Sequence, residues 1–182
     1  INAHTHAAMT LFRGMADDLP LLTWLNEYIF PAETHLTEEV VYTGTMLACA
    51  EMIKSGTTCF CDMYLFEHKV AEAAADAGMR AVVGEVLYDF PSPNYGPPEE
   101  GLRFSEELIR KWSGHPLVRI AVEPHSTYTC SPEYLTKIME IALEYKVPYV
   151  IHLAESRDEL AQVREKYGTT PVRHLESLKL LN

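Results

Sequence analysis

Residues 57–87 read TTCFCDMYLFEHKVAEAAADAGMRAVVGEVL, and this stretch sets the fold class. Thr57 to Met63 is dense in threonine, cysteine and phenylalanine and is typical of a strand. Phe66 to Ala77 is rich in alanine, and Gly78 stands after it at the position of a helix C-cap. Because Met79 to Leu87 is a second apolar run, the stretch predicts a strand, a helix and another strand in succession.

The same alternation continues on both sides of this stretch. Near-continuous apolar runs separated by helices are typical of a parallel sheet whose faces are covered. The segment 88–101 carries four prolines and two glycines and is expected to be a loop. We expect further strands at 1–6, 117–123 and 147–153, and helices near 8–15, 21–30, 37–56, 102–112, 131–146, 158–167 and 171–181.

Two architectures fit this alternation, a doubly wound open sheet and a (β/α)8 barrel. No glycine-rich phosphate loop follows the first strand, which weakens the nucleotide-binding open sheet. A complete barrel typically needs ~250 residues, whereas this chain has 182 residues and only five expected strands. No interior linker divides the chain, so we expect a single domain.

Charge and composition exclude several classes of function. Fifteen basic and 26 acidic residues give a net charge of −11, which argues against nucleic acids and anionic membranes as partners. No apolar run approaches the ~20 residues of a membrane span, and no signal peptide is evident. The sequence therefore predicts a soluble, cytoplasmic, globular protein.

The first chemical signal is the pair His4 and His6, at the end of the first expected strand. Side chains two residues apart on a strand point to the same face, so the two imidazoles are expected to converge. Neutral imidazole is the commonest side-chain ligand for zinc and similar metals. The alternative is a pair of surface histidines without a metal.

Two further histidines follow expected strands, His125 after the fourth and His152 at the end of the fifth. In parallel α/β folds, this end of the strands is where sites form. Each histidine alone could be a satisfied core residue, but three at one edge favour a common site. Glu155 follows His152 closely and is suited to general acid–base work beside a metal. Metal-assisted hydrolysis is therefore the expected reaction class.

Two other carboxylates are weaker candidates. Glu33 could be a binding group on a loop, with a solvated acid as the alternative. Asp62 follows a strand and could lie at its rim, although a turn-capping role explains it more simply. The remaining histidines are expected at the surface, namely His35, His68, His115 and His174.

Four stretches together resemble the amidohydrolase superfamily. The segment NAHTHAAMTLFRG at 2–14 resembles its first barrel strand and loop, and the other stretches are SGTT at 55–58, PHSTYTCS at 124–131 and HLAE at 152–155. The nearest branch is that of the 5′-methylthioadenosine/S-adenosylhomocysteine deaminases, which is related to triazine hydrolases and guanine deaminases. The resemblance covers essentially the whole chain. It implies an α/β fold, a (β/α)8 TIM barrel of the metal-dependent hydrolase type, here as its first five βα units.

The resemblance also implies roles for the candidate residues. His4, His6 and His152 would hold one divalent metal, Zn2+, with Fe2+ or Mn2+ as alternatives. Glu155 would carry a proton between water and a purine ring nitrogen, His125 would contact the substrate, and Glu33 would bind the ribose hydroxyls. The implied reaction converts an adenosine-type nucleoside, 5′-methylthioadenosine or S-adenosylhomocysteine, to the inosine analogue and ammonia.

Other features of the family are expected to lie outside residues 1–182. These are a small β-sandwich that flanks the barrel, a fourth histidine and a metal-binding aspartate on later strands. We therefore expect a partial barrel that is inactive by itself, with exposed strand edges that favour association between copies. The sister activities, triazine hydrolysis and guanine deamination, are alternatives. A catalytically incomplete metal-binding fragment is the alternative of another class.

Overall fold

The structure is a computed structural model that describes residues 1–181. The chain folds into two compact units. The first comprises Ile1–Glu85 and Leu108–Ile120, and the second comprises Val86–Glu107 and the described residues from Ala121 onward. Strand β3 (Arg80–Leu87) and helix α5 (Pro98–Trp112) each contribute residues to both units.

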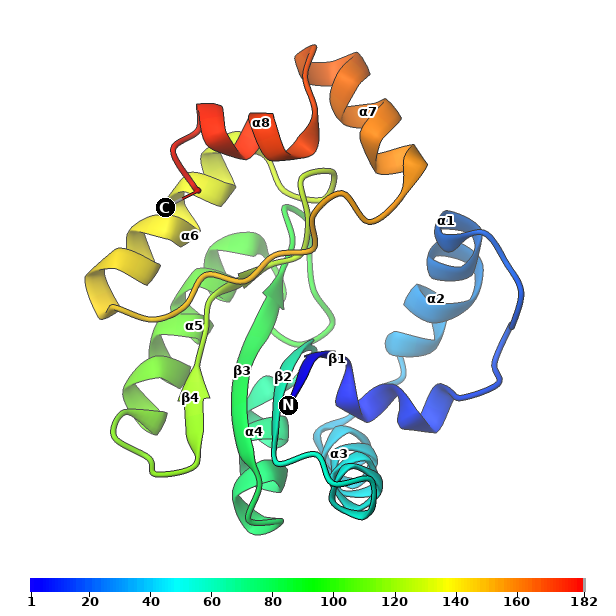
Figure 1. Cartoon of the computed structure of the whole chain (residues 1–182), viewed down its shortest axis with the longest axis vertical. Coiled ribbons are helices and arrows are strands. Elements are labelled where there is room, and N and C mark those ends of the chain that lie inside the picture. The colour runs from blue at the N-terminus through cyan, green and yellow to red at the C-terminus, as the bar shows by residue number, and fades with distance from the viewer. Residues whose placement is uncertain (182) are drawn as a thin grey trace. The chain divides into compact units, whose positions relative to one another are not determined.

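A parallel sheet runs through the first unit (Figure 1), as the alternating pattern predicted. The strand order is β1 (Asn2–Thr5), β2 (Cys59–Tyr64), β3 and β4 (Val118–Ile120). The register of β2 and β3 is regular from Cys59↔Arg80 to Tyr64↔Glu85. The pairing of β1 with β2 is irregular between Asn2 and Thr5. This irregularity includes the position of His4, and His6 follows directly after the strand.

The helices of the first unit begin at recognisable signals. Thr37 caps α3 (Glu38–Lys54) by accepting the N–H of Val40, and Glu38 and Glu39 lie in its first turn, where the helix dipole favours acids. Helix α3 packs against α4 (Glu67–Asp76) and against the 3₁₀ helix η1 (Ala7–Phe12). Residues 21–33 form one continuous helical segment, which consists of α1 (Leu21–Trp24), the π-helical η2 (Leu25–Ile29) and α2 (Phe30–Glu33).

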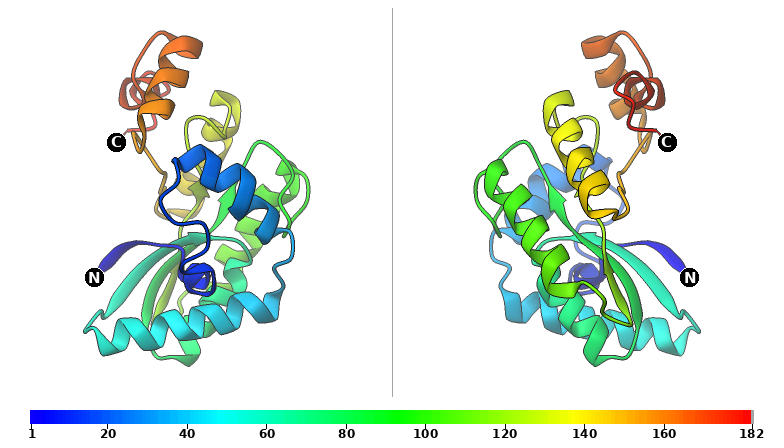
Figure 2. Two further views of the ribbon diagram at one scale, coloured as in Figure 1. Left: turned by 90° about the vertical axis from the view of Figure 1, so that its right-hand side faces the viewer. Right: turned by 90° about the vertical axis from the view of Figure 1, so that its left-hand side faces the viewer.

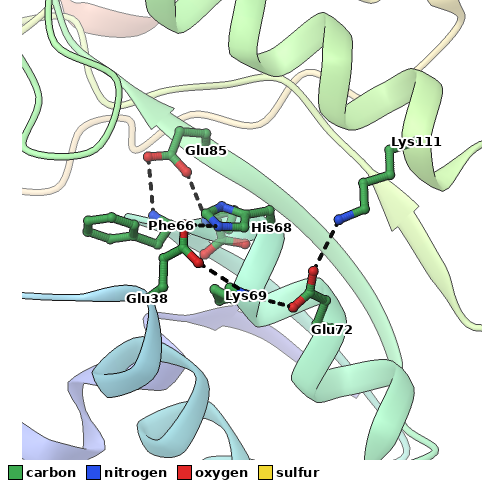
Figure 3. Close-up of polar contacts among 8 residues, drawn as sticks. Glu38, Phe66, His68, Lys69, Glu72, Glu85 and Lys111 are labelled. Carbon is green, nitrogen blue, oxygen red and sulfur yellow. Dashed lines mark hydrogen bonds and ion pairs between the residues drawn. The ribbon is translucent and has the colours of Figure 1, made fainter.

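A chain of ion pairs links α3, α4 and the end of α5 (Figure 3). Lys69 bridges Glu38 and Glu72 at 3.4 and 2.8 Å, and Lys111 reaches the second oxygen of Glu72 at 3.1 Å. His68 contacts Glu38 at 3.2 Å, and its side chain is only 17% exposed. His68 is therefore largely buried and not a surface histidine as predicted, and burial lowers its pKa.

The second unit contains the end of β3 and the following helices. Strand β5 (Glu123–Pro124) pairs with β3 through Val86↔Glu123 and Leu87↔Pro124. Helix α6 (Pro132–Tyr145) begins after Ser131, which caps it as predicted. Helices α7 (Arg157–Tyr167) and α8 (Pro171–Ser177) lie side by side (Figures 1 and 2).

Several expected boundaries differ in the structure. The strand expected at 117–123 is divided into β4 and β5. The one expected at 147–153 forms only two isolated bridges, Val122↔Tyr149 and Ser126↔His152. Pro148 has no N–H for a ladder, which explains part of this irregularity. Helix α5 begins at Pro98, inside the expected loop, because proline and the acids after it suit a first turn.

His174 also differs from the prediction of a surface histidine. It lies in α8 and is 5% exposed, and its ring stacks on that of Tyr167 with a centroid separation of 4.0 Å. Burial lowers its pKa. The contact that buries His174 comes from the neighbouring helix α7, far enough away that the local sequence of α8 does not contain it. Among residues 1–181, no helix combines the length and hydropathy needed to cross a membrane.

Gly44 of α3 lies directly against η1, so substituting it tests the packing of these two helices. A Cβ at position 44 would lie 2.7 Å from the carbonyl oxygen of Ala8. Because that neighbour is backbone, we expect Gly44→Ala to destabilise the protein by roughly 1–3 kcal/mol, despite the higher helix propensity of alanine. Thermal or urea unfolding measures the change. The exposed Leu47→Ala in the same helix is the control, and a Gly44→Ala protein as stable as the wild type would contradict the packing.

Candidate functional site

In the first unit, a buried carboxylate holds the end of β1. Asp62 of β2 is fully buried, and its Oδ1 accepts the N–H of Ala7 at 2.6 Å and the hydroxyl of Thr5. The residues on both sides of His6 are thereby tied to the neighbouring strand. The prediction that Asp62 follows a strand and caps the next turn is wrong, because Asp62 lies within β2 and accepts the N–H of the first residue of η1, which is far away in sequence.

His4 of β1 and His6, just after the strand, are arranged as metal ligands require. Nδ1 of His6 lies 2.6 Å from the carbonyl oxygen of Met63. A carbonyl only accepts, so Nδ1 carries the proton and Nε2 keeps its lone pair. Nε2 of His4 lies 3.3 Å from Nε2 of His6. Two nitrogens bound to a tetrahedral zinc at ~2.0–2.1 Å would be separated by about 3.3 Å, so the pair fits a shared ion.

In the second unit, the imidazole of His152 is oriented by a backbone carbonyl, as that of His6 is in the first unit. Its Nδ1 lies 3.0 Å from the carbonyl oxygen of His125, which also accepts the backbone N–H of His152 at 3.1 Å. Nδ1 must again be the donor, and Nε2 of His152 is left with a lone pair. The chemistry of this nitrogen suits a metal ligand.

The ring of His125 is held by hydroxyl groups and by aromatic rings. Its Nδ1 lies 2.9 Å from the hydroxyl of Thr129 and 3.2 Å from that of Ser126. The rings of Tyr88 and Tyr128 lie 5.2 and 5.7 Å away, centroid to centroid. Burial and the charge of Glu155 raise the pKa of Tyr128 to about 12, so this phenol stays neutral at physiological pH.

Glu155 has an exposed side chain on a turn that is tightly held. The residue before it, Ala154, has a left-handed φ of 56°, which costs a residue with a Cβ roughly 1–2 kcal/mol. The backbone N–H of Glu155 donates to the carboxylate of Glu159 at 2.7 Å. Ser156 then caps α7 by accepting the N–H of Glu159. The turn thus orients Glu155 through its backbone.

Glu33 lies at the end of α2 in the first unit and is 6% exposed. The loop position expected for it is therefore wrong, because the chain stays helical up to this residue. Burial raises the pKa of Glu33 to about 7, and a hydrogen bond from the hydroxyl of Tyr64 offsets part of the rise. The alternative of a solvated acid is also excluded. A buried carboxyl that is half protonated near neutral pH is typical of functional sites.

Glu159 was not predicted from the sequence, and its carboxylate contacts the backbone N–H of Glu155 and the hydroxyl of Thr127. One local signal was present. Ser156 and Glu159 have the spacing of a capping box, in which the glutamate returns to the backbone before the helix. In the structure this glutamate reaches the N–H of Glu155, one residue earlier than the standard motif.

A model of the amidohydrolase family matches residues 1–182 of the chain. The chain belongs to the amidohydrolase family. This amidohydrolase is 70% identical over 181 residues to a 5-methylthioadenosine/S-adenosylhomocysteine deaminase of Syntrophobacter fumaroxidans. The match covers all of this chain and 41% of that relative, so the chain spans less than half the length of the curated relatives it matches.

Solved structures of this family support the fold. A crystal structure of an adenosine deaminase from Xanthomonas campestris with bound zinc is 38% identical and superposes with a TM-score of 0.96, covering 100% of this chain and 42% of the neighbour. The guanine deaminase of C. acetobutylicum with bound guanine is 25% identical, with a TM-score of 0.87, over 97% of this chain and 45% of that one. The fold is therefore α/β, of the amidohydrolase barrel type, and metal use is a property of this amidohydrolase family.

The raised pKa of Glu33 makes stability depend on pH. The group is protonated in both states below its ordinary pKa of 4.5, and the folded protein loses stability as pH rises from there to about 7. Glu33→Gln removes this loss, so we expect it to stabilise the protein above pH 7 by up to about 3 kcal/mol relative to the wild type. The two proteins should be equally stable near pH 4. Chemical unfolding across this pH range measures the difference, and a pH-independent difference would contradict it. The exposed Glu27→Gln is the control.

Proposed function

We propose that the full-length protein containing this chain is a metal-dependent hydrolase that deaminates an adenosine-type nucleoside. Its substrates would be 5′-methylthioadenosine or S-adenosylhomocysteine, and its products the inosine analogue and ammonia. The observation that carries this proposal is the 70% identity, over all of this chain, to a relative curated as such a deaminase. The histidines and carboxylates of the two units supply side chains of the kind that this reaction needs.

We assign one divalent ion, zinc, to Nε2 of His4, His6 and His152, with Fe2+ or Mn2+ as alternatives. One observation in each unit supports the assignment. In the first unit, the nitrogens of His4 and His6 are close together. In the second unit, a backbone carbonyl accepts the Nδ1 proton of His152 and leaves Nε2 as the ligand atom. When bound, the ion supplies Lewis acidity and lowers the pKa of water to about 7. The zinc in the Xanthomonas campestris neighbour agrees with this choice.

Glu155 is the proposed proton carrier. Hydrolytic deamination joins a water oxygen to the ring carbon and releases the amino group of that carbon as ammonia. The carboxylate of Glu155 takes a proton from the water and delivers it to the adjacent ring nitrogen. Its exposed side chain and its fixed backbone suit this role.

His125 and Glu33 are the proposed substrate contacts. His125 offers an imidazole whose Nδ1 is already held by Thr129. Glu33 offers a buried carboxyl group, and two adjacent ribose hydroxyls are natural partners for such a group. Because a carboxylate accepts more strongly than a carboxylic acid does, nucleoside binding should strengthen as Glu33 ionises.

The two alternative activities of related enzymes can be distinguished from the proposed one by their substrates. Guanine deamination is favoured by the likeness to the guanine deaminase of C. acetobutylicum, and triazine hydrolysis is the other alternative within the class. Ammonia release from 5′-methylthioadenosine, guanine and a triazine distinguishes the three. A full-length protein that releases no ammonia from the nucleoside would exclude the leading proposal.

We further propose that residues 1–182 are part of a barrel domain that needs later strands for turnover. An assay of this chain alone tests this proposal against the alternative of a metal-binding fragment with another role, since full turnover would contradict the need for later strands.

The cytoplasm is the proposed location, and its reducing conditions suit four unpaired cysteines. Association between copies through the edge of β1 stays a prediction.

The ligand assignment predicts the metal content of variants. His4→Ala, His6→Ala and His152→Ala should each weaken zinc binding by more than about 100-fold, because loss of partners outside the ligand shell alone costs 10–100-fold. Competition with a chelator and zinc analysis measure the affinity. His35→Ala removes an exposed histidine and should bind zinc as the wild type does. Retention of full affinity in any of the three variants would remove that residue from the ligand set.

The role of Glu155 predicts a loss of rate without a loss of metal. In the zinc-loaded full-length protein, Glu155→Gln should lower kcat for ammonia release by roughly 10²–10⁴, the range typical of general acid–base groups. Steady-state assays with zinc analysis test this. Glu165→Gln, an exposed change on α7, should leave kcat unchanged. A zinc-loaded Glu155→Gln protein with the wild-type kcat would exclude Glu155 as the proton carrier.

A further inference from the structure

Glu159, in the first turn of α7, has no role in the proposed chemistry so far, although it is a buried acid next to Glu155. Its side chain is only 1% exposed. Oε1 accepts the hydroxyl of Thr127 at 2.7 Å, and Oε2 accepts the backbone N–H of Glu155 at 2.7 Å. Each carboxylate oxygen therefore has a short bond to a different segment of the second unit.

These two bonds connect the segments that carry the proposed functional side chains. Thr127 is 2% exposed and lies two residues after His125. The N–H of Glu155 lies three residues after His152. Hydrogen bonds to a carboxylate are short and about twice as strong as bonds between neutral groups. Burial increases their effect, because water cannot replace either partner.

The backbone beside Glu155 needs such a contact. Ala154 is held at a φ of 56°, a left-handed conformation that is unfavourable for a residue with a Cβ. Strained residues of this kind persist where the surroundings fix them from several sides. The bond from the next N–H to Glu159, together with the Ser156 cap on the N–H of Glu159, fixes this turn.

We infer that Glu159 is a positioning residue that fixes the Glu155 turn for proton transfer. The inference rests on the proposed role of Glu155. Glu159 does not reach the substrate; it acts by holding the backbone from which the Glu155 side chain extends. Without it, the turn would relax from its left-handed conformation, and the carboxylate of Glu155 would spend less time in position.

Three variants of Glu159 test this in the zinc-loaded full-length protein. Because a small displacement of a reacting group can cost about 10²-fold in rate, Glu159→Ala should lower kcat by roughly 10–100-fold while KM and zinc content stay close to the wild type. Glu159→Asp keeps the charge but is too short for both contacts, so its kcat should also fall. Glu159→Gln should keep most of the rate. Its amide oxygen can accept the N–H of Glu155, and its NH₂ group can donate to the hydroxyl of Thr127.

Asp158→Asn is the matched control, because it removes a charge from the same helix turn and Asp158 is exposed. Its kcat should be unchanged. Wild-type kcat in a folded, zinc-loaded Glu159→Asp protein would overturn the inference. So would a fall in kcat that is matched by loss of zinc or by a rise in KM, because Glu159 would then have a general structural role. If Glu159→Ala does not fold, the aspartate and glutamine variants give the same comparison.

Hydrogen exchange separates this inference from the proposed reaction. In the wild type, the N–H of Glu155 should be protected by Glu159, and Glu159→Asp should increase its exchange rate by about tenfold or more. This measurement needs no substrate. Unchanged exchange would overturn the positioning role even in an active deaminase. Faster exchange in a protein that does not release ammonia from nucleosides would instead support the positioning role and exclude only the proposed reaction.

Discussion

Buried carboxylates that accept backbone N–H groups hold the segments on which the candidate site depends. Asp62 accepts the N–H of Ala7, and Glu159 accepts that of Glu155. Glu85 repeats the arrangement before α4 (Figure 3), where it accepts the N–H groups of Phe66 and Glu67. In each case a buried carboxylate oxygen accepts a polar hydrogen at the end of a strand or the start of a helix, where the regular ladder has ended.

The fold was predictable where local preference and hydrophobic pattern agree. Residues 57–87 gave a strand, a helix and a strand within a few positions of those observed, because the same residues favour each element locally and bury its apolar side chains. The segment 147–153 looked equally apolar, yet it forms only isolated bridges. Whether an extended segment pairs regularly depends on its neighbours, and a single sequence does not contain that information.

The candidate site was predictable in part for the same reason. A two-residue spacing on a strand predicts converging side chains, and the nitrogens of His4 and His6 are indeed close. Their role as ligands stays a proposal. The contacts of Asp62 and Glu159 join residues 55 and 32 positions apart, respectively. No local pattern encodes these long-range partners, so Asp62 could only be interpreted as a cap of a nearby turn, and Glu159 was not predicted at all.

The imidazole tautomers have a consequence for how this family can change its sequence. His6 and His152 are oriented by main-chain oxygens of Met63 and His125. A main-chain oxygen neither titrates nor disappears when its residue is replaced. The choice of the nitrogen offered to a ligand therefore does not depend on which side chains occupy the supporting positions, as long as the backbone path is kept. The side chains of Met63 and His125 can then change while the two proposed ligand nitrogens keep their orientation.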